Sequence, residues 1–441
     1  MNRRVAAKRI RVANMAGYRV DWQASEPEAV LARWKRQEIR EGRITAGEDV
    51  EDDERCKKMC RAEIDKLRRQ RPSIDRDAVL ALWLEHATRN DADRRDALEE
   101  AADLLTRATA IAERRFNLYG LNDLRRPQAS LEDLRRWRRR VCYLRDCATA
   151  RAPEPAATEA VPRLGADASA AAVAAFLARG EPVVVEGGAD ACVAARGAWA
   201  PAALAASLGA KSAPLKAADA PFSEESWAGL GTKGQLPLGA FLERPDRGLY
   251  LHDWSLPRNA PEALRDELRT PRWLRGDFLR CCGDDVPYAG AWPSLFVGAP
   301  GTRSTCHVDS GSLHFAMALV HGGAKKWRVW RREDAAFLYP RFAVSADDVL
   351  FDAARAGAAQ PRWVVCQKPG DLVFVPSDCP HAVDNDGVTV GIATNFVDGS
   401  NVDAVAASLA DAGDAASLRL RQRLLALAGG GDAPPAKRAR V

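Results

Sequence analysis

Short runs of β-branched and aromatic residues, separated by turns, follow one another closely from Ser294 onward. They predict strands over Ser294–Val297, Thr305–Asp309, His314–Val320, Trp327–Trp330, Trp363–Gln367, Leu372–Val375 and Thr389–Val397. So many short strands in one stretch of chain favour a double-sheet jelly roll. The chain has 441 residues and is 47% hydrophobic, enough for one large core and a second, smaller unit.

Helical patterns flank this stretch, so we expect a mixed α and β protein. Ahead of the barrel, Ala171–Arg179 predicts a helix and Pro182–Glu186 predicts a buried strand. After the barrel, Ala404–Leu427 predicts a return to helix. The Ala- and Pro-rich segments that lead up to Leu249 indicate no definite element.

Residues 1–150 predict a helical, charged N-terminal region, with short apolar stripes at Glu28–Arg43 and Ala78–His86. They hold 34 Lys and Arg against 27 Asp and Glu, a net charge of +7, while the remainder has a net charge of −2. Pro- and Glu-rich composition without an apolar period predicts a linker over 151–165. The barrel domain should then span 166–410, with a C-terminal helix and basic tail over 411–441.

A further helix is predicted to open at Ser130. Its apolar residues recur at helical spacing, at Leu131, Leu134, Trp137, Val141 and Leu144. The arginines between them could contact nucleic acid phosphates or an acidic protein. A solvated helix face beside an apolar stripe is the simpler interpretation, because no motif that reads nucleic acid accompanies it.

The chain shows no pattern for crossing a membrane or for secretion. It has no run of 18 apolar residues, and no apolar segment follows the basic N-terminus. The ten cysteines are scattered without a framework spacing, which indicates reduced thiols inside a cell. We interpret Cys281, Cys282, Cys306 and Cys379 as packing residues.

A His-x-Asp pair, His307 and Asp309, lies at the end of a predicted strand. Because side chains alternate along a strand, both should project from one face. One imidazole and one carboxylate make two thirds of the triad that holds non-haem Fe(II). His381 follows the turn at 369–371 and the strand after it, and can supply the third ligand.

At this point the chain resembles the JmjC dioxygenases of the cupin group, in their protein-hydroxylase-like branch. The resemblance rests on ordered motifs: LYLHDWSLP (Leu249–Pro257), WPSLFVG (Trp292–Gly298), GTRSTCHVD, KKW (Lys325–Trp327), PGDLVFVPSDCPHAVDN (Pro369–Asn385) and TNFVDGSN (Thr394–Asn401). It implies a double-stranded β-helix barrel that uses Fe(II), 2-oxoglutarate and O2.

The resemblance also implies roles for single residues. His307, Asp309 and His381 should be the catalytic metal ligands. Lys325 should bind the far carboxylate of 2-oxoglutarate, with its neighbour Lys326 facing the opposite way. Ser304 and Asn395 match family positions that lie near the co-substrate. We interpret His252, His314 and His321 as buried core histidines.

The expected function is hydroxylation of a protein side chain, a lysine or another residue. Demethylation of N-methyl-lysine in histones is the alternative, and a non-catalytic scaffold is a second one. Substrates among chromatin, RNA-processing or translation proteins would suit the family. The cluster Lys437-Arg438-Ala439-Arg440 favours a nuclear location over the cytoplasm, although an arginine-rich chain also produces such clusters by chance.

Overall fold

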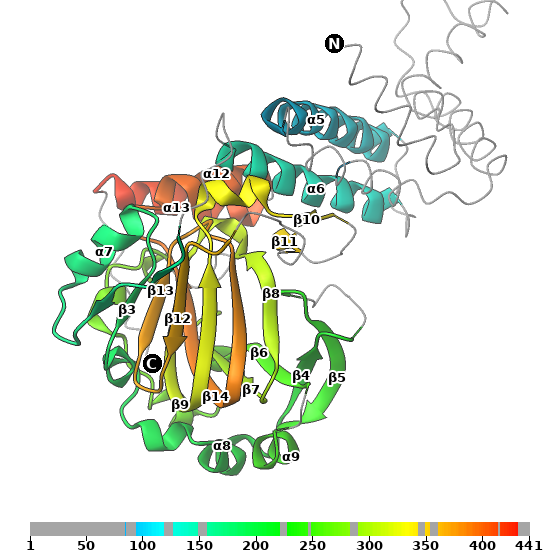
Figure 1. Cartoon of the computed structure of the whole chain (residues 1–441). Helices are drawn as coiled ribbons and strands as arrows, with labels where there is room; N and C mark the ends of the chain where they lie inside the picture. Colours follow the sequence, from blue (N-terminus) through cyan, green and yellow to red (C-terminus); the bar gives the residue numbers. More distant parts are fainter. Residues whose placement is uncertain are drawn as a thin grey trace, which may run out of the picture. The chain divides into compact units, whose positions relative to one another are not determined.

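The computed structural model describes residues 84, 94–118, 127–148, 157–220, 227–245, 248–282, 290–342, 349–352, 360–412 and 415–430. The chain divides into two compact units, Met1–Ala148 and Thr149–Val441. Figure 1 shows their elements, and each unit is described by itself. The expected stripe at Glu28–Arg43, that at Ala78–His86 apart from Leu84, and the cluster Lys437–Arg440 lie outside the described residues.

In the first unit, helices α5 (Arg94–Leu118) and α6 (Pro127–Cys147) pack against each other. Helix α6 begins at Pro127, earlier than Ser130, because proline suits the first helical position. Its predicted apolar stripe is buried at Leu134, Trp137, Val141 and Leu144. Arg136 and Arg140 are buried as well, whereas Arg135 is exposed, so the expected solvated face is wrong for these two arginines only. Their long aliphatic stems can cover apolar surface beside the stripe.

The second unit is built around two long antiparallel strands, β9 (His314–Val329) and β14 (His381–Phe396), which pair along their length. Each long strand has two further partners. The first half of β9 pairs with β13 (Leu372–Val375) and its second half with β12 (Trp363–Gln367). Strand β14 pairs first with β8 (Arg303–Val308) and then with β7 (Ser294–Gly298). The sheet thereby folds into the two layers of a jelly roll.

Shorter strands extend both layers. The structure places them at β1 (Glu159–Ala160), β2 (Arg163–Leu164), β3 (Val183–Val185), β4 (Ser212–Ala217), β5 (Gly231–Pro237), β6 (Tyr250–Ser255), β10 (Pro340–Arg341) and β11 (Val349–Phe351). Strands β1 and β2 fall inside 151–165, so the end of the expected linker is part of the sheet. A strand of two residues is too short to show an alternating pattern in the sequence. Residues of β1 and β2 form strands because they pair with β12 and β3.

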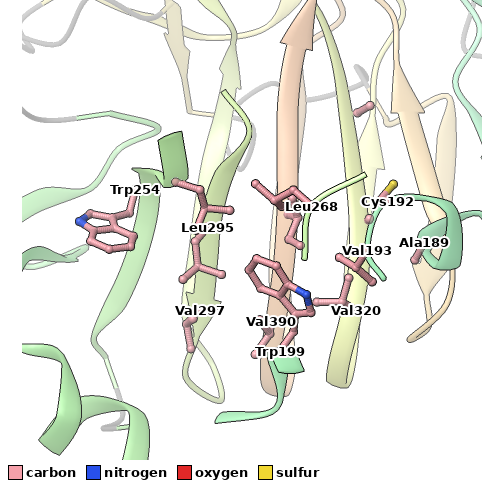
Figure 2. Close-up of a cluster of buried hydrophobic side chains, with 14 of the residues drawn as sticks. Ala189, Cys192, Val193, Trp199, Trp254, Leu268, Leu295, Val297, Val320 and Val390 are labelled. Carbon is pink, nitrogen blue, oxygen red and sulfur yellow. The ribbon is translucent and has the colours of Figure 1, made fainter. Parts of the chain in front are cut away.

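Alternation along the strands separates two cores. On β7, Leu295 and Val297 face an outer core, and Phe296 faces the barrel interior. The outer core also takes residues from helices α7 (Ala170–Ala178), α8 (Pro201–Leu208) and α9 (Leu238–Glu243). Figure 2 shows part of this core, with Trp199 and Val320 among its labelled side chains. The interior of the barrel is thus lined by a different set of side chains from those in the outer core.

The C-terminal helices α12 (Val402–Ala412) and α13 (Ala415–Ala428) complete this unit. Leu409, Leu420 and Leu424 share one buried cluster with Leu313 and Val397 of the barrel. The expected boundary between 410 and 411 therefore falls inside a helix that packs with its neighbours. None of the helices in the described residues is long and apolar enough to span a membrane.

Short helices fill the connections. They are α10 (Leu256–Asn259), α11 (Glu262–Arg265), η2 (Gly188–Ala191), η3 (Arg196–Trp199), η4 (Arg272–Leu274), η5 (Leu279–Cys281), η6 (Ser310–Ser312) and η7 (Arg332–Phe337).

Candidate metal centre

Strand pairing brings the three expected metal ligands together. His307 lies near the end of β8, and Asp309 follows that strand with extended backbone angles. His381 opens β14, where the register sets it opposite His307. One ligand atom from each of the three residues lies within 4.8 Å of the others. The i, i+2 spacing and the antiparallel register together create this cluster.

Both imidazoles are oriented by backbone carbonyls. The Nδ1 of His307 lies 2.7 Å from the carbonyl oxygen of Thr305, and the Nδ1 of His381 lies 3.1 Å from that of Cys379. A carbonyl only accepts, so each Nδ1 carries the proton and donates it. The Nε2 lone pairs are then available to a metal, which is how ligating histidines are commonly held.

The carboxylate of Asp309 is fixed on its other side by Asn395. The Nδ2 of Asn395 donates to Oδ2 of Asp309 at 3.0 Å, and Oδ1 lies 3.6 Å from Nε2 of His307. Burial alone would raise the pKa of Asp309, but His307, His381 and Asn395 together lower it below its usual value. Asp309 is therefore ionised, as a metal ligand must be. Asn395 reaches this carboxylate directly, which the sequence interpretation did not specify.

Burial keeps His381 neutral. The pKa of its imidazole is lowered to about 4, first by desolvation and then by the neighbouring His307, whose ring centroid lies 4.3 Å away. A neutral imidazole is the form that binds a metal. Two histidines and one carboxylate, closely grouped and largely buried, fit the facial triad of non-haem Fe(II) sites.

A cavity of about 280 Å³ adjoins these ligands. His307, Asp309 and His381 line it, together with aromatic side chains that include Trp227 and Trp292. Such a volume, mostly apolar with a few convergent polar groups, suits a small ligand with part of a substrate.

Lys325 is fully buried behind the cavity wall. Its Nζ donates to the Tyr250 hydroxyl at 3.0 Å and to Oδ1 of Asn385 at 2.7 Å. Tyr250 lines the cavity and Lys325 stands behind it. Lys326 faces outward as expected, and its Nζ pairs with Asp386 at 2.7 Å. The sequence interpretation named neither Tyr250 nor Asn385, although both lie in motifs that were recognised.

Ser304 and His252 lie on the same wall as Tyr250. Ser304 Oγ lies 3.3 Å from Nε2 of His252, and both residues line the cavity. The interpretation of His252 as a core histidine is therefore wrong. That of His314 is confirmed, because both of its ring nitrogens have partners in a buried setting. His321 is only half-buried, so it is not a core residue.

Comparison with known proteins finds a matching family model and several similar oxygenases. A family model described as "JmjC domain, hydroxylase" matches residues 355–396, which include His381 and Asn395. A 2-oxoglutarate and iron-dependent oxygenase, JMJD4, of Danio rerio is 29% identical over 167 residues, covering 36% of this chain and 38% of that protein.

The same protein of Homo sapiens is 29% identical over 161 residues, which is 35% of this chain and 38% of the relative. The arginine-specific demethylase JMJ22 of Arabidopsis thaliana is 25% identical over 170 residues, 36% of this chain and 33% of the relative. The chain thus spans well under half the length of the curated relatives it matches.

Proposed function

Since the barrel of this chain is a JmjC domain, we propose that the protein is an Fe(II)- and 2-oxoglutarate-dependent oxygenase that hydroxylates a protein side chain. One observation carries the proposal. His307, Asp309 and His381 converge beside a cavity whose wall also contains Tyr250, a hydrogen-bond partner of the buried Lys325. The donor set fits iron, and the lysine fits an acidic co-substrate.

His307, Asp309 and His381 would hold the metal on one side. Bound Fe(II) and 2-oxoglutarate supply the activation of O2, with succinate and CO2 as the products of the co-substrate. The carbonyls of Thr305 and Cys379 fix the two imidazoles, so the ligands need no rearrangement. Surrounding apolar side chains keep water from the reacting atoms.

Lys325 would attract the far carboxylate of 2-oxoglutarate. Its hydrogen-bond partners in the described structure, Tyr250 and Asn385, are both neutral. A buried cation without an opposite charge is costly, and an anionic ligand on the cavity side of Tyr250 would offset that cost. Asn385 is itself held by Thr302 and Thr389, which keeps Lys325 in place. Ser304 would add a hydroxyl group on the same wall.

The rest of the cavity suits a cationic side chain such as lysine. Trp227 and Trp292 provide aromatic surface, and Asp253 provides a carboxylate. Hydrogen bonds from Ser294 and Trp292 orient that carboxylate. Aromatic faces and a carboxylate together attract ammonium or guanidinium groups. A methylated basic side chain would meet the same surface, and the similarity to JMJ22 keeps demethylation as the second candidate.

Product analysis tests this proposal. The purified protein is incubated with Fe(II), 2-oxoglutarate and a proteome-derived peptide library, and mass spectrometry follows the peptides, succinate and formaldehyde. We expect succinate and peptides that gain one oxygen atom, both lost in His307→Ala. Formaldehyde with loss of a methyl group would establish the demethylase instead. Absence of succinate from the wild type would support the scaffold.

A further inference from the structure

A bulge in strand β6 turns two consecutive side chains into the cavity. The pairing of β6 with β7 shifts register between Leu251 and Trp254, and Asp253 has a φ of 57°. As a result both His252 and Asp253 line the cavity, before Trp254 returns to the outer core. In a regular strand the two side chains would point to opposite faces, so only one of them could face the cavity. Bulges often occur where a strand turns a side chain toward a functional site.

His252 is held in this wall from three sides. Its ring meets Tyr250 edge-on with centroids 5.0 Å apart, and Phe296 at 4.8 Å. Its Nε2 lies 3.3 Å from Ser304 Oγ. In the described structure its buried Nδ1 has no hydrogen-bond partner. A buried polar atom of this kind is costly unless a ligand completes it.

The charges around His252 decide which ligand fits. Burial, and then Lys216, His307 and Lys325, lower the pKa of the imidazole well below 6.5, so the ring is neutral. With a neutral ring, the Ser304 hydroxyl can donate to Nε2, which leaves the proton on Nδ1. The unused group is then a hydrogen-bond donor beside two lysines, and an acidic acceptor suits it.

We propose that His252 is a co-substrate-binding residue, whose Nδ1–H donates to a carboxylate oxygen of 2-oxoglutarate on the wall formed with Ser304 and Tyr250. This inference rests on the proposed function. It adds His252, on the same strand as Tyr250, to the residues that bind the co-substrate, and it assigns to Ser304 the role of fixing the imidazole tautomer.

Binding without turnover tests the inference. Mn(II) replaces iron, and calorimetry measures the affinity of the Mn(II)-loaded protein for 2-oxoglutarate. His252→Phe keeps the aromatic packing but removes the donor, so we expect affinity to fall about 10- to 100-fold. His252→Asn offers an amide N–H near the position of Nδ1, so affinity should stay near the wild-type value. His321→Phe, a half-buried histidine that does not line the cavity, is the control and should change nothing.

The outcomes separate the inference from the proposed function. Wild-type affinity in His252→Phe would overturn the role of His252 and leave the oxygenase intact. A wild-type protein that binds Mn(II) but not 2-oxoglutarate would overturn both. Should His252→Phe fail to fold, His252→Asn is compared with His252→Leu, and equal affinities for 2-oxoglutarate would contradict the inference.

Discussion

At the scale of single residues, the uncharged hydrogen-bond partners of the buried Lys325 indicate the co-substrate as clearly as the metal ligands indicate the metal. Lys325 shows no exposed surface, and its hydrogen bonds go to a hydroxyl and an amide. Its neighbour Lys326 is exposed and pairs with Asp386. The two lysines thus offer a matched pair, identical in chemistry and adjacent in sequence.

We expect Lys325→Ala to raise the concentration of 2-oxoglutarate needed for half-maximal succinate production by on the order of 100-fold or more, because a buried charge pair would be broken. Lys326→Ala should leave that concentration unchanged. Circular dichroism of both variants controls for folding. Equal shifts in the two variants would mean that Lys325 does not recognise the co-substrate.

Asp277 makes the stability of the folded protein depend on pH. Burial raises the pKa of its carboxyl to about 7, although the backbone N–H groups of Val397 and Leu279 donate to it. The folded state therefore holds a proton that the unfolded chain releases near pH 4. This contribution to stability is present below pH 4 and is lost as pH rises toward 7.

Asp277→Asn keeps the accepting Oδ1 but cannot ionise. Relative to this variant, the wild type should lose about 2–4 kcal/mol of unfolding free energy between pH 4 and pH 8. Urea unfolding at several pH values measures the difference, and exposed Asp266→Asn is the control. Parallel pH curves for the wild type and Asp277→Asn would contradict the raised pKa.

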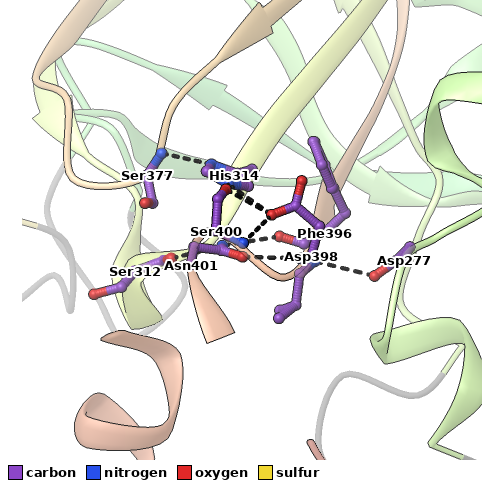
Figure 3. Close-up of polar contacts among 9 residues, drawn as sticks. Asp277, Ser312, His314, Ser377, Phe396, Asp398, Ser400 and Asn401 are labelled. Carbon is purple, nitrogen blue, oxygen red and sulfur yellow. Dashed lines mark hydrogen bonds and ion pairs between the residues drawn. The ribbon is translucent and has the colours of Figure 1, made fainter. Parts of the chain in front are cut away.

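At the scale of elements, a polar network ties the segments around the metal centre together (Figure 3). His314, at the start of β9, accepts a hydrogen bond from the Ser377 N–H at 2.8 Å. Its Nε2 lies 2.9 Å from Ser400 Oγ and 3.4 Å from Asp398. Asn401 also donates to the carbonyl of Ser312, three residues after Asp309. The network thus connects the segments that follow and precede the metal ligands.

His314→Ala should destabilise the protein by about 1–3 kcal/mol, because the Ser377 N–H and the Asp398 carboxylate lose a buried partner. Urea unfolding at neutral pH measures this loss. His321→Ala, made at a half-buried histidine on the same strand, should cost much less. An equal cost at both positions would mean that the network adds no stability.

The strands that the sequence predicted and those it missed differ in their pattern. Residues 314–320 and 327–330 were expected as two strands, yet they form one, because Gly322 and Gly323 let β9 run past a bulge in β14. A Cβ on either glycine would meet the backbone of Val388 or Asp386. Strand β5, by contrast, is polar and contains glycine, so no run of β-branched residues marked it.

The residues of the candidate site likewise divide into those that a sequence pattern predicts and those that only the folded sheet brings together. The sequence could predict the metal ligands His307, Asp309 and His381, because their spacing and order are visible in the sequence itself. The role of His252 could not be selected, because it depends on the bulge at Asp253, which pairing with β7 creates. Asn395 was placed near the co-substrate, but its contact with Asp309 depends on the pairing of the end of β14 with the start of β9.

At the scale of the whole molecule, the basic residues outside the barrel suggest where the protein acts. We propose that Lys437-Arg438-Ala439-Arg440 directs it to the nucleus. A large fluorescent reporter fused to residues 433–441 should enter the nucleus, and the same fusion with Lys437, Arg438 and Arg440 changed to alanine should not. Equal nuclear signal from both fusions would exclude this segment, and a cytosolic full-length protein would favour translation factors as substrates.

We propose that His307, Asp309 and His381 form an iron centre that oxidises 2-oxoglutarate. The most direct measurement is Fe(II)-dependent succinate production by wild type, His307→Ala, Asp309→Ala and the control His321→Ala, with folding checked by circular dichroism. We predict that the wild type and the control produce succinate only with Fe(II), and that both ligand variants fold but produce none. Fe(II)-dependent succinate from either ligand variant would contradict the claim.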